Sequence, residues 1–239
     1  MAEKVNVAND KLAKMEAENE KCKELEISSN RLYATTVIQQ ISMNDVEQNS
    51  RKYCLTFHNI KFPPGTRIDH FTCMDKVIQI CKAMGIEKLQ NLDYGDFSAC
   101  HILPQRKTSA DQSKSEAESI EKEVKTTSII AKFVNLHCAE TIFFKRKLTK
   151  DFDDDTRAEI GIPQGKNIHI SPNLTDLNRK VMKQAFELKN QMGWKFIWAD
   201  CRGTIKVRQG DATEIKVVKC TEDIVELEGT IVLKERILC

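Results

Sequence analysis

The sequence predicts an α+β chain in three parts: a long N-terminal helix, a ferredoxin-like β-α-β-β-α-β domain, and a small C-terminal domain with a helix and a β-hairpin. Three observations lead to this prediction. Residues 1–50 contain neither proline nor glycine and have apolar residues at helical spacing. Residues 51–171 alternate between strand-like and helical patterns. Residues 172–239 open with an apolar helical stripe followed by two short alternating segments.

The first 50 residues are expected to form a helix that self-associates as a coiled coil. A seam of residues at steps of three and four, apolar at about half of its positions, runs from Leu12 to Cys22 and again from Leu25 to Val46. A three-residue interruption separates the two runs, as occurs in coiled coils. Many inward positions are polar, which weakens a coiled coil but can set its register and strand number. We expect a dimer or trimer; the alternative is a single solvated or partly disordered helix.

Residues 51–171 are expected to form the ferredoxin-like domain, which is the architecture of RNA-recognition (RRM-type) modules among many others. Residues 105–126 are polar, mixed in charge and without periodicity, which predicts a long flexible loop between the second and third strands. The predicted strands are 53–60, 97–103, 128–136 and 168–170, and the predicted helices are 73–84 and 138–150.

The C-terminal helix is expected over Leu174–Met192. Thr175 is suited to cap its N-terminus, and Gly193 is expected to end it. Its apolar stripe would turn one face toward a core and leave basic residues on the other. The stripe consists of Leu174, Leu177, Val181, Ala185, Leu188 and Met192.

A hairpin with a turn at 200–203 is expected next. Trp194, Phe196 and Trp198 alternate along the first strand, so they are predicted to share one face and to cover the helix as core. The alternative use of these rings, as platforms for stacking nucleic-acid bases, is the less favoured interpretation.

The second strand of the hairpin separates apolar from basic residues. Ile205 and Val207 would join the face that covers the helix. Lys206 and Arg208 would then point to the opposite face, beside Lys195. These cations would therefore lie together on the face of the hairpin that is turned away from the core.

Positive charge is concentrated in this region. Residues 178–208 contain eight Lys or Arg against two acids, whereas the whole chain has a net charge of only +2. Such a concentration is expected for a nucleic-acid partner, but a simply solvated surface would look the same. On the basis of charge, the candidate nucleic-acid contacts are Lys145, Arg146, Lys147, Arg179, Lys183, Lys195 and Arg202.

The composition predicts a soluble intracellular protein, cytoplasmic or nuclear. The chain is 30% charged, has no apolar run of about 18 residues, and starts without a signal-peptide pattern. Its nine cysteines are scattered, with no C-x-x-C pair and no zinc-type spacing. We therefore expect reduced, mostly buried thiols, no metal, no cofactor and no membrane contact.

No catalytic constellation is evident, so the chain is not expected to be an enzyme. Residues 161–167 are one residue short of a phosphate-binding loop, and Lys166 is not followed by Ser or Thr. The five histidines have no spacing that suggests a base beside a nucleophile. The aspartates at 151, 153, 154 and 155 are interpreted as an acidic surface loop rather than a metal site.

Several stretches resemble a known family. Residues 46–55 with 57–60, residues 168–175, and the two hairpin segments 193–198 and 203–208 are similar to first-open-reading-frame proteins of LINE-type retrotransposons. They also resemble the few-polyhedra (FP) proteins of baculoviruses and insect proteins that carry the FP C-terminal domain. The resemblance is most specific in the C-terminal hairpin.

The resemblance implies a coiled coil at 1–50, an RRM-like domain at 51–171 and a nucleic-acid-binding C-terminal domain at 172–239. In the retrotransposon proteins, such parts bind single-stranded nucleic acid without strong sequence preference and act as a nucleic-acid chaperone. The positions that match the family as phosphate contacts are Arg51, Lys52, Lys206 and Arg208.

The chain departs from the family pattern at two positions and keeps only a fragment of the third-strand motif, at residues 131–136. Thr56 occupies the place of the usual stacking aromatic, and Ile102 follows His101 where the family often has Arg. Phe133 is the remaining candidate platform on the first sheet, with a core position as its alternative. Stacking should then be weak, and phosphate electrostatics should supply most of the affinity.

Together these features predict a non-enzymatic protein that binds single-stranded RNA or DNA, RNA being the first expectation, with a chaperone or ribonucleoprotein-packaging role. The alternative is a coiled-coil structural or viral assembly protein, similar to FP proteins, whose nucleic-acid binding is weak or secondary.

Overall fold

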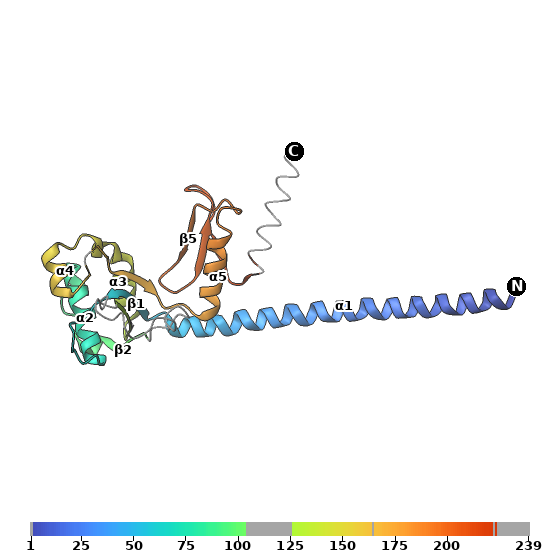
Figure 1. Cartoon of the computed structure of the whole chain (residues 1–239), viewed down its shortest axis with the longest axis horizontal. Helices are drawn as coiled ribbons and strands as arrows, with labels where there is room; N and C mark the ends of the chain where they lie inside the picture. The colour runs from blue at the N-terminus through green and yellow to red at the C-terminus, as the bar shows by residue number, and fades with distance from the viewer. Residues whose placement is uncertain (1, 104–125, 164, 222, 224–239) are drawn as a thin grey trace, which may run out of the picture. The chain divides into compact units, whose positions relative to one another are not determined.

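The computed structural model contains helices and two antiparallel sheets, as the α+β prediction requires (Figure 1). The chain divides into two compact units, residues 1–46 and residues 47–239. The structure describes residues 2–103, 126–163, 165–221 and 223.

Helix α1 (Ala2–Arg51) is continuous, in agreement with the predicted N-terminal helix. A run without proline or glycine permits this length because every backbone amide can bond to the preceding turn. Nine of its large apolar side chains are between 51% and 74% exposed in the single chain, whereas Val37 and Ile41 are half-buried. None of the described helices combines the length and the apolar character needed to span a bilayer. The exposed apolar residues of α1 are Leu12, Met15, Leu25, Ile27, Leu32, Tyr33, Ile38, Met43 and Val46.

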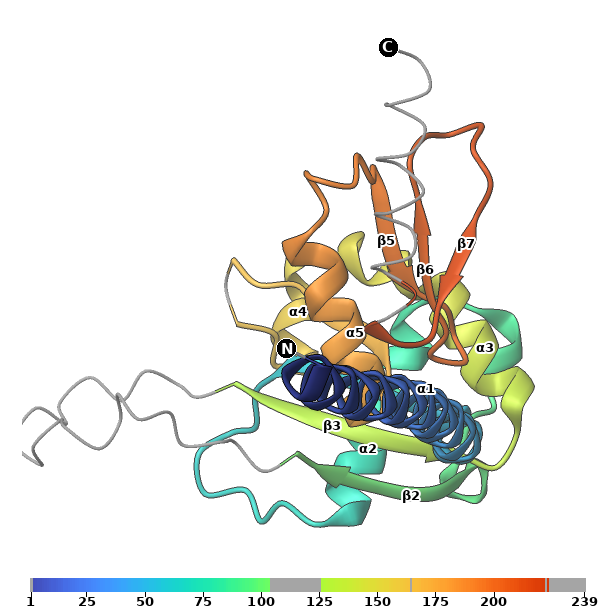
Figure 2. The ribbon, with the colours of Figure 1, turned by 90° about the vertical axis from the view of Figure 1, so that its right-hand side faces the viewer.

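A four-stranded antiparallel sheet forms the middle of the chain, and its elements follow the predicted order. The spatial order of the strands is β2-β3-β1-β4, and Figure 2 shows β2 beside β3. The predicted loop at 105–126 lies outside the described residues, except for Thr126. The elements are β1 (Cys54–Ile60), α2 (His70–Ala83), β2 (Phe97–Ile102), β3 (Thr127–Phe133), α3 (Leu136–Lys145) and β4 (His169–Pro172), with short 3₁₀ turns at Glu87–Leu89, Tyr94–Asp96 and Arg146–Lys150.

The core of this part lies between the sheet and the helices α2 and α3. Alternate strand residues such as Leu55 and Phe57 face it, together with the Val77 and Ile80 stripe of α2. Phe133 is also buried there, with its ring centroid 5.0 Å from that of Phe97. The core alternative for Phe133 is therefore correct, and the ring is not available as a stacking platform.

The predicted boundary between the third strand and the second helix is wrong by three residues. β3 ends at Phe133, and the Asn135 side chain accepts a hydrogen bond from the His137 amide at 2.9 Å. This N-cap starts α3 at Leu136 because it satisfies an amide that has no partner within the helix.

The acidic segment at 151–155 lies at the surface as predicted, but its last two aspartates belong to a helix rather than to a loop. The Asp153 side chain accepts a hydrogen bond from the Thr156 amide at 2.8 Å and caps helix α4 (Asp154–Ile160). The next two aspartates lie in the first turn, where the helix dipole favours negative charge. Gly161, with a φ of +75°, ends the helix in the left-handed conformation that glycine tolerates. The aspartates therefore have a local structural role.

The C-terminal part pairs one helix with a three-stranded antiparallel sheet of order β5-β6-β7. Helix α5 packs against β5 and β6 (Figure 2). The third strand was not predicted. The elements are α5 (Asp176–Glu187), β5 (Phe196–Ala199), β6 (Ile205–Arg208) and β7 (Lys216–Val218).

The predicted stripe and N-cap of α5 are confirmed, but its predicted end is not. The Thr175 hydroxyl accepts a hydrogen bond from the Asn178 amide at 3.2 Å. The regular helix stops at Glu187, and the chain continues in turns to Gly193, whose φ is +60°. The Met192 amide still bonds to the carbonyl of Leu188, so Met192 reaches the core and is 3% exposed.

The side chain of Gln48, near the end of α1, connects three segments of the second unit. Its Oε1 accepts hydrogen bonds from the Thr175 amide (2.9 Å) and from Asn178 Nδ2 (3.1 Å). Its Nε2 donates to the Asn173 carbonyl at 3.1 Å. Asn178 Nδ2 also donates to the carbonyl of Gly203, in the turn between β5 and β6, at 3.0 Å. Gln48 is 7% exposed, so these bonds are almost fully removed from water.

Gly203 is required beside Gln48 for two reasons. Its φ is +83°, a conformation that side chains with a Cβ rarely adopt. A Cβ at this position would lie 2.3 Å from Gln48 Nε2, which is closer than any real contact. Arg51 adds a bond from its guanidinium to the Leu174 carbonyl at 2.9 Å. The end of α1 is thereby fixed to the start of α5.

The eight described cysteines are reduced thiols, and five of them are buried. Burial raises the pKa of Cys73 to about 11 and the pKa of Cys100 to about 12. These thiols stay protonated near neutral pH, so they act as small apolar core residues. Cys22 on α1 is exposed.

Replacing Gln48 with Ala should lower the free energy of unfolding of the second unit by about 2–3 kcal/mol, because it leaves the Thr175 amide and the Asn173 carbonyl buried without a partner. Urea denaturation followed by tryptophan fluorescence measures this, since both tryptophans lie in the C-terminal part. Gln40→Ala, at an exposed position of the same helix, is the control and should change little. Equal effects of the two substitutions would show that the Gln48 bonds are unimportant.

Candidate nucleic-acid interface

The β5-β6-β7 sheet has one face covered by α5 and one face turned away from it. Residues paired directly across antiparallel strands point to the same face. Phe196 pairs with Arg208, and Trp198 pairs with Lys206. Val217 of β7 pairs with Lys206 and is 45% exposed. We call the surface formed by Phe196, Trp198, Lys206, Arg208 and Val217 the open face.

The prediction that Trp194, Phe196 and Trp198 share the core face is correct only for the first of them. Trp194 is 4% exposed and lies in the core beside α5. It precedes β5, however, so the strand alternation does not extend from it to Phe196. Ile197 and Ala199 occupy the core face instead, and Phe196 and Trp198 are half-buried on the open face. Two aromatic rings therefore lie beside the cations.

The predicted direction of Lys206 and Arg208 is confirmed, since Ile205 and Val207 on the same strand are each 1% exposed on the core face. The Arg208 guanidinium lies 4.8 Å from the centroid of the Phe196 ring, and Lys195 Nζ lies 5.1 Å from it. Cations at these distances are attracted by the ring face. The aromatic and basic groups form one continuous surface.

Carboxylates accompany the cations of this surface. Lys206 Nζ is 2.9 Å from Asp200 Oδ2, and both side chains are mostly buried, at 30% and 23% exposed. Asp200 Oδ1 also accepts from the Arg202 and Thr204 amides, each at 3.0 Å, so it is held in place by the turn. Asp211 lies near both Lys195 and Arg208. Neither acid stands out in the sequence, because Asp211 lies 16 residues from Lys195 and Asp200 lies in the turn between β5 and β6.

Arg202 and the basic run at 145–147 lie outside the open face. Arg202 NH2 is 3.3 Å from Glu140 Oε1 on α3, so the β5-β6 turn is ion-paired to that helix. Arg146 donates to the Phe143 carbonyl at 2.7 Å and stacks on its ring at 3.9 Å, and burial lowers its pKa. It caps the end of α3. Lys145 and Lys147 are exposed and have no ion pair with any described residue.

Arg51 and Lys52 hold positions at the end of α1. The Arg51 guanidinium is occupied by the Leu174 carbonyl and, at 2.5 Å, by Glu47 Oε1. Lys52 Nζ lies 5.2 Å from the Tyr53 ring centroid. Arg51 thus has a structural role, and its predicted phosphate contact stays a prediction.

Arg179 and Lys183 lie on the exposed side of α5, away from the sheet. Arg179 pairs with Asp176, and Lys183 Nζ is 3.5 Å from Glu187. Because α5 covers the opposite face of the sheet, neither cation joins the open face. The structure therefore brings together Lys195, Lys206 and Arg208, and leaves Arg179 and Lys183 apart from them.

The four-stranded sheet also has a face turned away from its helices, and this face is rich in histidine. His58 on β1 bonds through Nδ1 to Ser128 Oγ at 3.0 Å and through Nε2 to Ser171 Oγ at 2.9 Å. The ring centroid of His169 lies 5.4 Å away. Burial and the neighbouring imidazole lower the pKa of His58, and burial and Arg146 lower the pKa of His169. Both rings are therefore neutral at neutral pH.

Thr56 lies on this histidine-rich face, in register with Ser171, and is 4% exposed. Phe57, the neighbouring aromatic residue, is fully buried on the other face. The described part of the histidine-rich face therefore carries no Phe, Tyr or Trp ring, whereas the open face carries Phe196 and Trp198.

Comparison with known proteins supports the resemblance to baculovirus FP proteins, and it does so for the C-terminal part of the chain. The family model described as Baculovirus FP protein domain 2 matches residues 175–228, a segment that includes α5 and all three strands of the smaller sheet. No curated protein matches the chain. The resemblance to LINE proteins stays a prediction.

Proposed function

We propose that this chain is a non-enzymatic protein that binds single-stranded nucleic acid through the open face of its C-terminal sheet. One observation carries the proposal: Phe196 and Trp198 lie on the same face as Lys206 and Arg208, opposite the core. Single-strand binders without sequence preference combine stacking rings with cations that follow the backbone. RNA is the first expected ligand, and DNA the second.

The two aromatic rings raise the contribution that base stacking is expected to make to the affinity. The sequence alone predicted weak stacking, because the first sheet lacks aromatic platforms. Stacking of one base on an aromatic side chain contributes about 1–3 kcal/mol by alanine substitution. Trp198 and Phe196 can each offer part of a ring face, since both are half-buried. Stacking should therefore add to the phosphate contacts of Lys206 and Arg208.

The rest of the second unit is proposed to act as a scaffold with a lesser role in binding. Residues 51–171 would be an RRM-type domain, and residues 172–239 an FP-type nucleic-acid-binding domain. The histidine-rich face of the larger sheet offers neutral imidazoles and no large aromatic ring among its described residues. Lys145 and Lys147 are exposed cations at the end of α3, the helix that Arg202 contacts, and they would add positive charge outside the open face.

Helix α1 is proposed to join two or three copies of the chain as a coiled coil. Its apolar side chains are exposed in the single chain, and burial of such residues is what drives helix association. Two or three linked open faces would bind one long strand more tightly than a single face. Once one face is bound, the others meet the same strand at a high effective concentration. This arrangement suits a chaperone or packaging role.

A second candidate is a structural or viral assembly protein similar to FP proteins, with weak nucleic-acid binding. The pairing of Lys195, Lys206 and Arg208 with carboxylates favours it, because paired cations attract phosphate less. The match to an FP domain fits both candidates. Salt dependence separates them, because only phosphate binding releases counterions from a nucleic acid.

Substitution of Trp198 with Ala should weaken binding of a single strand about 5- to 150-fold, which corresponds to about 1–3 kcal/mol of stacking. The double substitution Lys206→Ala with Arg208→Ala should weaken it across all sequences and flatten the salt dependence. Fluorescence anisotropy with a labelled 30-nucleotide RNA, and the matching DNA, at several salt concentrations measures both. For the wild type, about six phosphate contacts predict a log–log slope of about −4.

The matched control is Arg179→Ala with Lys183→Ala, which removes the same charge from the exposed side of α5. Affinity should fall less for this pair than for the pair on the open face. Equal losses would mean that general electrostatics dominates and that the open face is not the site. Absent or salt-independent binding by the wild type would favour the assembly role.

Substitution of Leu32 and Met43 with Asp should convert the oligomer to a monomer, because charges would replace apolar residues on the predicted seam. Gln40→Asp with Thr35→Asp, at exposed positions off the seam, should leave the oligomer intact. Light scattering coupled to size-exclusion chromatography gives the mass directly. A monomeric wild type at micromolar concentration would disprove the coiled coil.

A further inference from the structure

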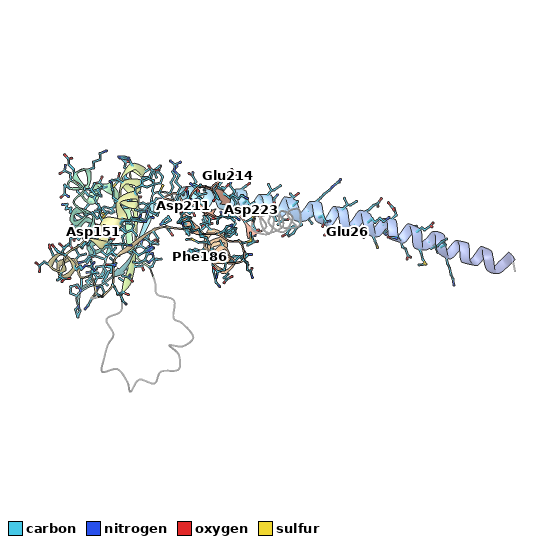
Figure 3. All side chains as sticks on the ribbon, turned by 90° about the horizontal axis from the view of Figure 1, so that it is seen from above. Glu26, Asp151, Phe186, Asp211, Glu214 and Asp223 are labelled. Atoms are coloured by element: carbon cyan, nitrogen blue, oxygen red, sulfur yellow. The ribbon has the colours of Figure 1, made fainter. Side chains whose placement is uncertain are left out.

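Asp211 lies in the connection between β6 and β7, at the edge of the open face, and is labelled with Glu214 in Figure 3. Its Oδ2 is 2.5 Å from Lys195 Nζ, and its Oδ1 is 3.6 Å from Arg208 NH2. One carboxylate thus lies between two cations that also flank the Phe196 ring.

The guanidinium of Arg208 is incompletely satisfied in this arrangement. Its Nε is the single buried side-chain nitrogen or oxygen in the described part of the chain that lacks a hydrogen-bond partner. Its contact with Asp211 is longer than a hydrogen bond. Buried donors without partners are rare and are costly to leave unmet. An anion placed closer to the guanidinium would make the hydrogen bonds with Arg208 that Asp211 does not make.

We propose that Asp211 occupies the place of a nucleic-acid phosphate between Lys195 and Arg208 and is displaced when the strand binds. This inference rests on the proposed function and adds a means by which the site regulates its own affinity. In the free protein, the Asp211 carboxylate would bind weakly between Lys195 and Arg208 until a phosphate of the strand takes its place.

The exposure of the pair makes displacement inexpensive. The side chains of Lys195 and Asp211 are 56% and 71% exposed, and exposed ion pairs contribute about 0.2–1 kcal/mol to stability. Arginine forms two parallel hydrogen bonds with a carboxylate or a phosphate, but Asp211 lies 3.6 Å from Arg208 NH2 and does not reach that geometry. A phosphate of the strand is not tied to the β6-β7 connection and can take it up. Exchange of the carboxylate for the phosphate therefore favours the complex.

Asp200 differs from Asp211 and is not expected to be displaced. It is 23% exposed, and two backbone amides of the β5-β6 turn hold its Oδ1. Removing it would disturb the turn itself. The two acids on this surface therefore have different roles, Asp200 as a structural anchor and Asp211 as an exchangeable anion.

The test is the substitution Asp211→Asn in the full-length protein, measured by anisotropy with the labelled 30-nucleotide RNA. Affinity should rise about two- to fivefold, the range corresponding to one exposed ion pair. The log–log salt slope should become more negative by about 0.7, because one more cation becomes available to neutralise phosphate. Glu214→Gln, in the same connection, removes the same charge but has no ion pair with any described residue. The affinity of this control variant for the RNA should rise less than twofold.

A second arm repeats Asp211→Asn in a Lys195→Ala, Arg208→Ala background. The gain should disappear there, because the cations that Asp211 occupies are gone. If the wild type binds and Asp211→Asn binds no tighter, or if Glu214→Gln gives the same gain, the inference is wrong while the proposed function stands. If the wild type does not bind at all, the proposed function fails and this inference with it. A thermal melt verifies that each variant is folded.

Discussion

The hydrogen bonds of Gln48 are the constraint on which the C-terminal part depends. A single amide side chain bonds to the chain just before α5, to the first turn of α5 and, through Asn178, to the turn that joins β5 and β6. The position of this turn fixes the register of the hairpin behind it. Gly203 has to be a glycine because the Gln48 amide fills the space of a Cβ. The end of the N-terminal helix is therefore part of the fold of the second unit.

The hairpin register in turn determines the chemistry of the open face. Pairing of Phe196 with Arg208 and of Trp198 with Lys206 places two aromatic rings and two cations on the side away from α5. A shift of one residue would exchange them with Ile197, Ala199, Ile205 and Val207 and would destroy the core. The packing of α5 thus enforces the arrangement that we propose binds a strand. Asp200 and Asp211 then set how much of its positive charge is available.

Sequence patterns predicted the elements of the fold well where periodicity was strong. The helical stripe of α5, the cap at Thr175 and the four strands of the larger sheet follow directly from residue spacing. The face of Phe196 and Trp198 was predicted wrongly because Trp194 was counted as part of the strand. Local pattern could not show that the strand starts two residues later. Long-range partners such as Gln48 with Thr175, or Lys195 with Asp211, leave no signal in a single sequence.

The measurement that tests the central claim most directly is ultraviolet cross-linking of the full-length protein to a single-stranded RNA, with the cross-linked residues identified by mass spectrometry. A cross-link forms only where a base and a side chain are in close contact, and aromatic side chains react readily with the excited base. The account predicts cross-links at Phe196 or Trp198 on β5. Cross-links confined to the histidine-rich face of the larger sheet, at His58 or His169, would contradict it.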